Sequence, residues 1–186
     1  PKKSVGQHYL TDETICRSIV DSFNIDKDNH VIEIGPGQGA ITGFLLEKTA
    51  SLSVIEIDNN NCEILKVKFP NLHIINKDIL DFDFDSFGNI AGKKLRIIGN
   101  IPYNITTEII FRLIDHRKSI LDAQLMVQEE VALRLAGKPN SKEYGIPSVF
   151  IQVFSKPELR FKVSRSNFYP KPKVDSRIIY FDFTKN

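Results

Sequence analysis

The sequence has no tryptophan, one methionine and only two cysteines among its 186 residues. Cys16 and Cys62 stand far apart, each inside a helix-like pattern, so we expect two reduced, packed thiols and no disulfide. Histidine, cysteine and acidic residues do not recur at the spacing of a metal site, and none is predicted. No apolar run approaches the ~18 residues of a membrane helix, and the N-terminal segment lacks the apolar stretch of a signal peptide. We therefore expect a cytoplasmic protein without a membrane partner; a monomer is a separate expectation.

The composition favours a single domain. Its 41% hydrophobic content can fill one core, and its 26% charged content argues against disorder. The net charge is +2, but acidic and basic residues are unevenly distributed along the chain. Residues 54–85 carry seven acidic side chains and three lysines. Basic residues gather instead between Lys156 and Arg177, interleaved with Phe161, Phe168 and Tyr169. Such a stretch suits RNA, with cations for phosphates and rings for bases, but a solvated face with buried aromatics explains it equally well.

Strand-like and helix-like segments alternate along most of the chain. Strands are expected at residues 30–35, 51–57, 71–75, 94–100 and 121–128. Helices are expected at 11–23, where Thr11 or Asp12 is the cap, at 38–48 and 59–69, and after the fourth and fifth strands. This alternation predicts an α/β fold with a mostly parallel sheet and helices on both faces. Two further strands, 158–163 and 176–183, have no helix between them and predict an antiparallel hairpin at the edge of a seven-stranded sheet. Residues 137–145 are expected to form a loop within the domain.

The first chemical signal is "VIEIGPGQGA", where three glycines follow a buried strand. Gly35, Gly37 and Gly39 allow a ligand to approach the backbone and are expected to present free amides at the start of a helix. Glu56 ends the next strand 21 residues after Gly35, near the offset of about 20 at which an acid reaches a ribose hydroxyl. The segment also fits the dinucleotide fingerprint, as Gly35-x-Gly37-x-x-Ala40. This motif alone therefore leaves the cofactor open, and a purely structural turn is the alternative.

Asp78 follows the third strand, at the rim of the same predicted crevice. A carboxylate there can accept from an exocyclic amine such as that of adenine, although aspartate is also common at strand ends for its own backbone bonds. Acids follow both the second and the third strand, and no arginine or lysine follows the glycines to meet a pyrophosphate. This combination favours S-adenosylmethionine over NAD.

The segment "GNIPYNITTEII", residues 99–110, puts unusual residues between a buried strand and a helix. A plain connection would need only glycine or aspartate, yet this one carries Asn100, Pro102, Tyr103 and Asn104. Two amides and a phenol bring polar groups to the end of a buried strand. We therefore expect this turn to contact a ligand.

Together these motifs resemble those of the adenine-N6 methyltransferases that dimethylate ribosomal RNA. The likeness rests on Glu-x-Gly-x-Gly-x-Gly, on the two strand-end acids and on Asn-Ile-Pro-Tyr, and it runs over nearly the whole chain. "GQHYL" resembles the family's opening, "QEEVALRLAGKPNSKEYG" the segment after its fifth strand, and "FYPKPKVDS" its late substrate loop. The Lys-Pro-x-Ser-Lys-x-Tyr-Gly run and Asp175 favour the small-subunit branch of the family.

The resemblance implies a Rossmann-like class I methyltransferase fold. It implies transfer of methyl groups to the N6 amines of two adjacent adenines in 16S-type ribosomal RNA, with the RNA or the assembling small subunit as partner. His8 departs from the pattern, because the family commonly has asparagine there. The residues that the resemblance assigns to S-adenosylmethionine are His8, Leu10, Gly35, Gly37, Glu56, Ile57, Asp78, Ile79 and Asn100.

The chemistry of adenine gives the Asn-Ile-Pro-Tyr turn a role. An exocyclic adenine amine is a poor nucleophile because its lone pair is delocalised into the ring, so the site must favour a pyramidal nitrogen. The side-chain oxygen of Asn100 and the carbonyl of Ile101 or Pro102 are expected to accept its two N–H bonds. Proline is expected to aim its carbonyl into the crevice, while Tyr103 and Phe168 stack on the flipped base. The residues expected to contact RNA phosphates are Arg165, Lys171 and Lys173.

Three alternatives remain at this stage. The macrolide-resistance methyltransferases, which act on 23S-type RNA, share "NIPYN"; an NAD-dependent oxidoreductase is a more distant possibility; and a non-catalytic RNA-binding module is a third. Relatives in the small-subunit branch usually continue into a small helical domain after the last strand. Residues 1–186 are therefore expected to form the catalytic domain alone, without that helical domain.

Overall fold

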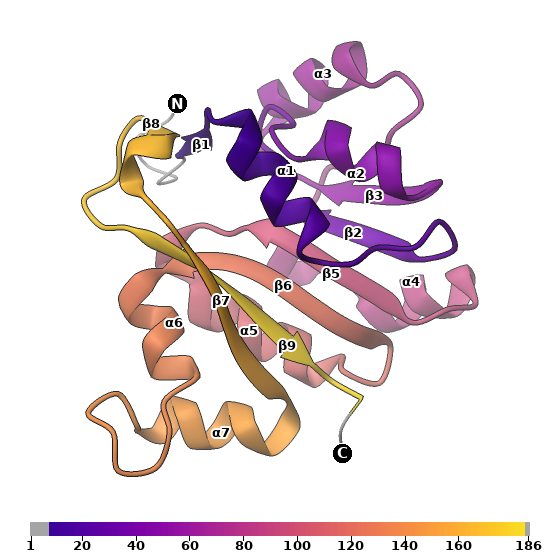
Figure 1. Cartoon of the computed structure of the whole chain (residues 1–186). Helices are drawn as coiled ribbons and strands as arrows, with labels where there is room; N and C mark the ends of the chain where they lie inside the picture. The colour runs from indigo at the N-terminus through magenta and orange to yellow at the C-terminus, as the bar shows by residue number, and fades with distance from the viewer. Residues whose placement is uncertain (1–7, 185–186) are drawn as a thin grey trace.

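The computed structural model describes residues 8–184. A seven-stranded sheet forms the centre of the protein. Its strand order is β4-β3-β2-β5-β6-β9-β7 (Figure 1). The parallel strands are β2 (His30–Ile34), β3 (Ser51–Ile55), β4 (His73–Ile75), β5 (Leu95–Asn100) and β6 (Ile120–Gln128). Strand β9 (Ser176–Asp182) pairs antiparallel with β6. Strand β7 (Lys156–Val163) pairs antiparallel with β9 and forms the edge of the sheet. The predicted antiparallel edge pair is confirmed.

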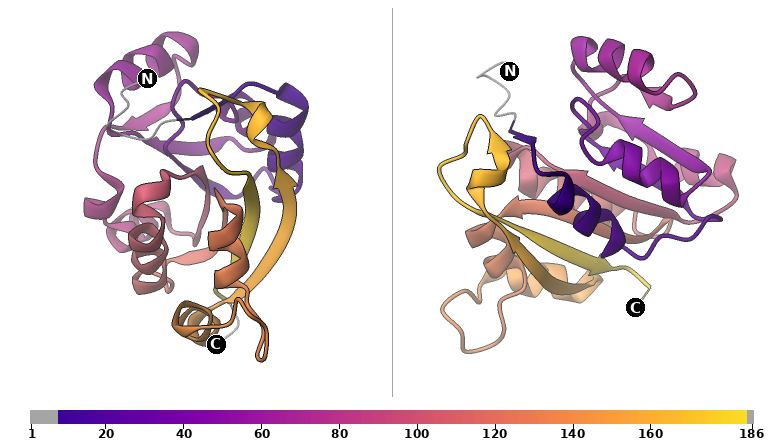
Figure 2. Two further views of the ribbon diagram at one scale, coloured as in Figure 1. Left: turned by 90° about the vertical axis from the view of Figure 1, so that its left-hand side faces the viewer. Right: turned by 45° about the horizontal axis from the view of Figure 1, so that its top comes forward.

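Helices cover both faces of the sheet (Figure 2). On one face lie α1 (Glu13–Asp21), α2 (Thr42–Lys48) and α3 (Asn59–Lys68), whose apolar side chains share a core with Val31, Val54 and Ile98. On the other face lie α4 (Phe84–Ala91), α5 (Thr106–Asp115), α6 (Glu129–Leu135) and α7 (Ile146–Phe154), packed on Ile32 and Ile97. Successive residues of β2 thus enter opposite cores, as the period of two requires. The predicted fold class is confirmed.

Helix α2 begins later than expected, at Thr42 instead of about residue 38. Gly35, Gly37 and Gly39 have φ angles of 63°, 57° and 81°, which lie in the left-handed region. Such backbone cannot belong to a right-handed helix, so the glycine segment forms a run of turns before α2 starts. Helix α1, in contrast, begins where predicted, because the Asp12 side chain accepts from the amides of Thr14 and Ile15.

Helices α4 and α7 were not predicted from the sequence. Helix α4 begins within a run of alternating acidic and aromatic residues, 81–85. The Asp83 side chain caps the helix by accepting from two backbone amides, and Gly92 ends it with a φ of 65°. The capping aspartate and the terminal glycine are the features of the sequence that indicate this helix.

A buried ion pair explains the charged residue within strand β5. Arg96 is only 8% exposed, and its guanidinium donates to both carboxylate oxygens of Asp122 on β6, at 2.9 and 2.7 Å. It also donates to the backbone carbonyls of Phe23 and Asn24, while the hydroxyl of Tyr180 donates to Asp122. Because nearly every polar atom of this pair has a partner, it fixes α1 against the sheet without leaving a charge unsatisfied.

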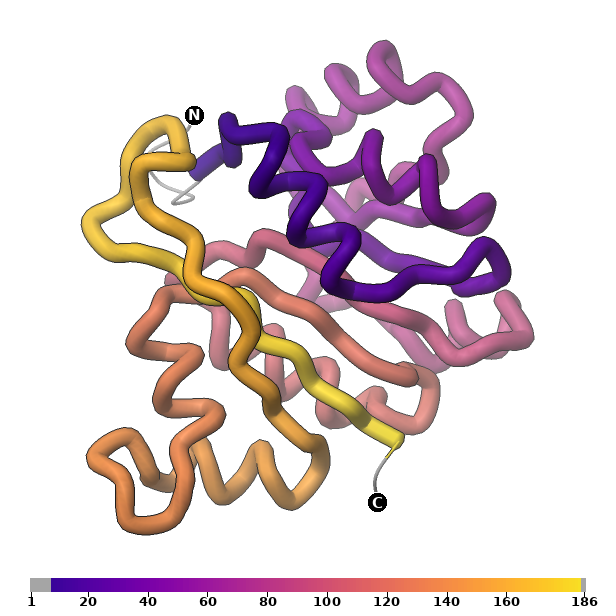
Figure 3. The backbone as a smooth tube through the Cα atoms, viewed as in Figure 1, coloured from indigo at the N-terminus to yellow at the C-terminus, as the bar shows by residue number. Residues whose placement is uncertain are grey.

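Two segments from the two ends of the chain lie side by side (Figure 3). Strand β1 (Tyr9–Leu10) pairs antiparallel with β8 (Phe168–Tyr169), and the amide of Thr11 donates to the carbonyl of Asn167 at 2.9 Å. We call residues 8–11 and 167–170 together the clasp. The clasp was not predicted, because two-residue strands are too short to show a period.

The order of the strands creates a crevice. From β2 the chain passes to β3 and β4 on one side, and then crosses to β5 and β6 on the other. The carboxyl ends of β2 and β5 therefore flank the point at which the strand order reverses, where ligands bind in open α/β sheets. Gly35 and Asn100 meet at this point, since a Cβ on Gly35 would lie 3.6 Å from the Asn100 carbonyl oxygen.

Three smaller expectations concern the rest of the chain. Cys16 and Cys62 are free and buried, as predicted, and burial raises the pKa of Cys16 to about 11. Residues 137–145 lie between α6 and α7 within the same domain, as expected. Among residues 8–184, no helix is both long and apolar enough to cross a membrane.

Candidate functional site

One pocket lies at the carboxyl ends of β2 and β5 and gathers most of the predicted site residues. It is bounded by the glycine turn, by the residues that follow β3 and β4, by the turn after β5 and by the clasp. The predicted residues that line it are His8, Leu10, Gly35, Gly37, Glu56, Ile57, Asp78, Ile79, Asn100, Pro102 and Tyr103. The fold thereby brings residues from His8 to Tyr103, a span of 96 positions, to one cavity. The ring centroids of His8 and Tyr103 lie 5.7 Å apart. The opening residues of "GQHYL", before His8, lie outside the described residues.

The glycine turn is shaped by close contacts, and its amides are not free. A Cβ on Gly37 would lie 2.8 Å from the ring of Tyr9, so only glycine fits there. The Gly35 amide donates to the carbonyl of Ile55, the Gly37 amide to the Glu56 carboxylate, and the Gly39 amide to a carbonyl within the turn. The expectation of free amides at a helix start is therefore wrong. These amides offer no cradle for a pyrophosphate, which removes the main support for a dinucleotide.

Glu56 is held in place by backbone amides. Its two carboxylate oxygens accept from the amides of Gly37 and Asp58, at 3.0 and 2.9 Å, and the residue is only 3% exposed although it lines the pocket. Burial raises the pKa of this carboxyl, while the two amides act in the opposite direction. The Asn61 side chain also lowers the pKa, and the four lone pairs of the carboxylate still leave it able to accept from a ligand hydroxyl without losing these bonds.

Asp78 and two isoleucines form the neighbouring part of the wall. One carboxylate oxygen of Asp78 accepts from the amide of Leu80 at 2.9 Å, which caps a short 3₁₀ turn. The other oxygen has no hydrogen bond with the described residues, so the structural and the ligand-binding interpretations of Asp78 are compatible. Ile79 is 7% exposed, whereas Ile57 is 55% exposed. An exposed isoleucine at the mouth of a pocket provides a flat apolar surface for a ring.

Asn100 has a fixed orientation. Its Nδ2 donates to the main-chain carbonyl of His8 at 3.1 Å, and because a carbonyl can only accept, the amide nitrogen must face the clasp. The Oδ1 atom makes no hydrogen bond with the described residues and is left for a ligand. His8 is itself anchored, because its Nδ1 donates to the carbonyl of Pro170 at 2.7 Å. The clasp thus decides which end of the Asn100 amide is available.

The carbonyl of Pro102 is used within the fold. It accepts from the amide of Ile105 at 3.3 Å and from the hydroxyl of Thr106 at 3.1 Å, where the chain enters α5. The expectation that proline aims its carbonyl into the crevice is therefore wrong, because these two donors occupy its lone pairs. Of the two carbonyls considered, that of Ile101 is the better candidate, and Ile101 lines the pocket. Proline instead fixes the direction of the turn.

Tyr103 is held at both ends of its side chain. It lies in a short 3₁₀ turn, Tyr103–Ile105, and its hydroxyl forms a 2.7 Å hydrogen bond with the Oγ of Ser176. Its ring also lies near that of His8, at an interplanar angle of 31°. Burial raises the pKa of the phenol, which therefore stays neutral at physiological pH.

Phe168 does not line the pocket in this structure. It is 4% exposed and packs in the core of the α1–α3 face, where its strand pairs with Leu10. The expected stacking of Phe168 on a base is not available in this arrangement, because the ring is already used for packing. The neighbouring Tyr169 is 70% exposed instead.

The basic segment divides into residues with and without internal partners. Arg177 donates to Glu129, Arg160 donates to Gln124, and Lys162 pairs with Asp175 at 2.8 Å. Arg165 is exposed, but its guanidinium donates to the Lys173 carbonyl at 2.8 Å. The ammonium groups of Lys171 and Lys173 are exposed and make no ion pair with the described residues. The predicted phosphate contacts therefore depend mainly on these two lysines.

A sequence profile described as "Ribosomal RNA adenine dimethylase" matches residues 1–185. The chain belongs to this family. Curated relatives named "Ribosomal RNA small subunit methyltransferase A" are 47% identical in Chlorobium chlorochromatii and 44% in Chlorobium phaeobacteroides, each over 96% of this chain and 67% of the relative. The relative in Francisella tularensis subsp. novicida is 44% identical and is covered over 69% of its length. The chain thus spans about two thirds of the length of these relatives.

Solved structures agree with the adenine dimethylase assignment. The 23S rRNA methyltransferase ErmE superposes with a TM-score of 0.84 at 26% identity, covering 96% of this chain and 70% of ErmE. A dimethyladenosine transferase from Plasmodium falciparum superposes with a TM-score of 0.82 at 30% identity, covering 93% of this chain and 62% of that chain. The sheet order seen here is therefore that of Rossmann-like methyltransferases.

Glu33 and Tyr9 are among the residues that line this adenine dimethylase pocket without having been predicted to bind a ligand. Glu33 lies within β2, is 1% exposed and accepts from the hydroxyl of Thr42 at 2.7 Å, and its burial raises the pKa to about 8. An acid inside an otherwise apolar strand was the signal for it. Tyr9 lines the pocket beside Gly37, and nothing in the local sequence distinguishes it from a packing tyrosine.

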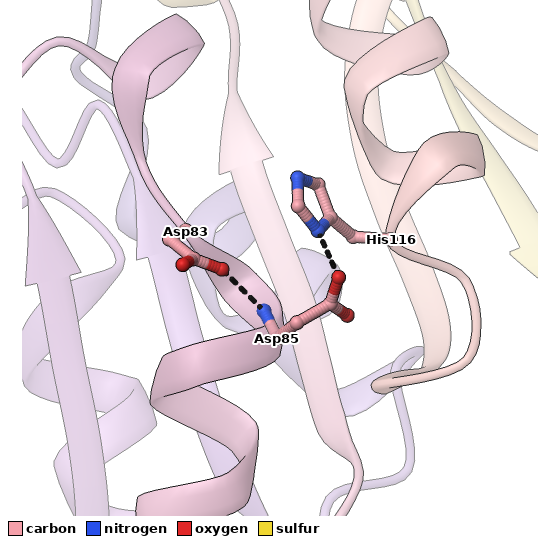
Figure 4. Close-up of side chains that lie close together, drawn as sticks. All are labelled: Asp83, Asp85 and His116. Carbon is pink, nitrogen blue, oxygen red and sulfur yellow. Dashed lines mark hydrogen bonds and ion pairs between the residues drawn. The ribbon is translucent and has the colours of Figure 1, made fainter.

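A second polar group lies on the α4–α7 face of the sheet (Figure 4). The potential ligand atoms of Asp83, Asp85 and His116 lie within 4.8 Å of one another. Asp85 accepts from His116 Nδ1 at 2.7 Å and from the hydroxyl of Ser119, and Asp83 accepts from the hydroxyl of Ser86 and from the Asp85 amide. Because every carboxylate oxygen already has a protein donor, this group joins the start of α4 to the end of α5 without an ion.

Proposed function

We propose that this chain is the catalytic domain of an S-adenosylmethionine-dependent enzyme that dimethylates the N6 amines of two adjacent adenines in small-subunit ribosomal RNA. The orientation of Asn100 carries the proposal. Its Nδ2 is taken by the His8 carbonyl, so the end that remains for a ligand is an acceptor, and Ile101, whose carbonyl is the second acceptor, lines the same pocket. Two acceptors side by side are what an exocyclic amine requires.

The pocket fits S-adenosylmethionine. Glu56 has lone pairs left for ribose hydroxyls, Asp78 has one oxygen left for the adenine amine, and Ile57 offers an exposed apolar surface for the base. Glu33 adds a buried carboxyl, and a ligand ammonium near it would lower its raised pKa and hold it ionised. The occupied amides of the glycine turn disfavour NAD, whose pyrophosphate would have no cradle.

The chemistry needs positioning more than acid–base catalysis. The bound cofactor supplies an electrophilic methyl group on a sulfonium. Asn100 Oδ1 and the Ile101 carbonyl accept the two N–H bonds of the target amine, which turns the nitrogen lone pair toward that methyl. The face of the Tyr103 ring supports the flipped adenine. The amine proton becomes acidic only as the methyl group arrives, so a strong base is unnecessary.

The RNA target is proposed from the relatives. Those named for the small subunit are 41–47% identical to this chain, whereas the 23S enzyme ErmE is 26% identical. Lys171 and Lys173 supply exposed cations for the RNA backbone on the segment that leads from the clasp to β9. We further propose that the protein acts as a monomer in the cytoplasm on ribosomal RNA or on an assembling small subunit.

The test is a methylation assay with labelled S-adenosylmethionine and separated small-subunit and large-subunit ribosomal RNAs, followed by mapping of the methylated base. We expect label at N6 of two adjacent adenines in the small-subunit RNA. Label only in the large-subunit RNA would show that the enzyme acts on the alternative target and would overturn the small-subunit assignment. Calorimetry with S-adenosylmethionine and NAD provides the cofactor control, and binding of NAD alone would overturn the proposal.

A further inference from the structure

We propose that Ser176 is a positioning residue that sets the angle of the Tyr103 ring in the pocket. The inference rests on the proposed function, in which that ring supports the target adenine. The observation behind it is the 2.7 Å hydrogen bond between the Ser176 Oγ and the Tyr103 hydroxyl, which joins residues 73 positions apart.

Ser176 is held rigidly. It is 0% exposed and is the first residue of β9, where it pairs with Gln128 of β6 on one side and with Val163 of β7 on the other. A residue with strand partners on both sides has little freedom to move. Its hydroxyl is therefore a fixed point against which a mobile ring can be located.

Tyr103 needs such a fixed point. Its backbone lies in a 3₁₀ turn of three residues that has no side-chain cap. The aromatic ring nearest to its own ring is that of His8, in the clasp. A ring fixed only at its Cα can swing about χ1 and χ2, and stacking on a base depends on the plane of the ring. The bond to Ser176 fixes the far end of the side chain and with it χ1, and because a phenolic O–H prefers the plane of its ring, it also favours one χ2 angle while the face of the ring stays available for the substrate.

The position of Ser176 also relates the ring to the RNA backbone. The segment 170–175 carries the exposed Lys171 and Lys173 and enters β9 at Ser176. Ser176 thus joins the segment proposed to grip phosphates to the ring proposed to receive the base. A flipped adenine stays covalently linked to its own phosphates, and this connection holds the phosphate-binding segment next to the ring.

The test compares Ser176→Ala, Tyr103→Phe and the double variant in the methylation assay with ribosomal RNA. Because both single variants remove the same hydrogen bond, we expect kcat to fall roughly three- to tenfold in each, and the double variant to be no slower than the slower single one. Cofactor affinity should stay unchanged in all three. Ser164→Ala is the matched control, because that serine is exposed and its hydroxyl bonds only with Ser166 among the described residues.

A second readout does not depend on activity. In protein labelled with ¹³C at the tyrosine rings, the Tyr103 signal is assigned by its loss in Tyr103→Phe, and its ring-flip rate is measured by NMR. We expect faster flipping in Ser176→Ala and an unchanged rate in Ser164→Ala. Unchanged flipping in Ser176→Ala, an unchanged kcat, or additive losses in the double variant would overturn the role of Ser176 while methyl transfer persists. A wild-type chain that methylates no ribosomal RNA would instead overturn the proposed function.

Discussion

The two walls of the pocket are built in different ways. The wall made by the glycine turn and Glu56 uses contacts between neighbouring strand–helix units, such as the Gly37–Glu56 bond, which joins residues 19 positions apart. The opposite wall is assembled from distant parts of the chain, because the Asn100–His8 bond spans 92 positions and the Tyr103–Ser176 bond spans 73. The first wall forms as the parallel sheet forms, whereas the second requires both ends of the chain to be in place.

This difference has a consequence for dynamics. The glycine wall is backed by five-residue strands that pair in register, whereas the clasp contains only two residues in each strand. Short pairings open more easily than the central sheet. The proposed cofactor wall is therefore the stable part of the site, and the proposed substrate wall is the part that can respond to a ligand.

The largest expected effect comes from Asn100, which lies where the two walls meet. Asn100→Ala removes the Oδ1 acceptor, so methyl transfer should slow by ~10²–10³-fold, by analogy with the loss of one oxyanion-hole donor. Cofactor affinity should fall far less than the rate, and the melting temperature should fall only slightly, because the clasp loses one hydrogen bond. Single-turnover kinetics and calorimetry measure the two effects separately.

Asn104→Ala is the matched control for this prediction, because Asn104 is exposed in the same turn and does not line the pocket. Equal rates for Asn100→Ala and wild type would identify the residue as a structural amide. Unfolding of Asn100→Ala would lead to the same conclusion, and the proposed mechanism would fail.

The next effect tests the stable wall. Glu56→Ala should weaken cofactor binding at least tenfold, because a charge-assisted hydrogen bond contributes about 1.5–3 kcal/mol. It should also lower the melting temperature, since the buried amides of Gly37 and Asp58 lose their acceptor. Glu63→Ala, at an exposed acid of α3 that pairs with Lys66, should change neither property. Wild-type cofactor affinity in folded Glu56→Ala would contradict the assignment.

A smaller effect tests the substrate wall. Lys171→Ala and Lys173→Ala should each reduce the slope of log affinity for RNA against log salt by about 0.7–0.9, with cofactor affinity unchanged. Lys162→Ala is the control, because its ammonium is already paired with Asp175. If all three variants have the wild-type slope, Lys171 and Lys173 do not contact RNA phosphates and are ordinary solvent-exposed residues.

The smallest effect lies outside both walls, at Asp85. Hydrogen bonds from Ser119 and His116 lower the pKa of this carboxyl, so below about pH 4 the unfolded state binds more protons than the folded state. Stability should therefore fall as the pH drops through the folded pKa, and Asp85→Asn should make that fall less steep. The effect should stay below about 1 kcal/mol, because the side chain is 49% exposed. Urea unfolding of both proteins between pH 3 and 7 measures it, and parallel curves would refute it.

The sequence was sufficient for features that depend on local chemistry. Alternating strands and helices predicted the sheet, Asp12 predicted the start of α1, and the glycines marked the turn after β2. The acids after β3 and β4 and the turn after β5 were assigned to one crevice because the carboxyl ends of parallel strands meet at one edge. These inferences hold because the period of an element and the conformational freedom of glycine act over a few residues.

The tertiary structure decided which atoms of those residues are available. The amides of the glycine turn and the Pro102 carbonyl looked free in the sequence, yet neighbouring residues occupy them. Phe168 looked like a stacking ring and is buried, whereas Ser176 looked unremarkable and holds Tyr103. The Pro102 carbonyl is taken by the local turn into α5, whereas the Gly35 and Gly37 amides, Phe168 and Tyr103 depend on residues distant in the sequence or on packing. A sequence specifies a residue's own donors and acceptors, but only the folded chain determines which of them are already satisfied.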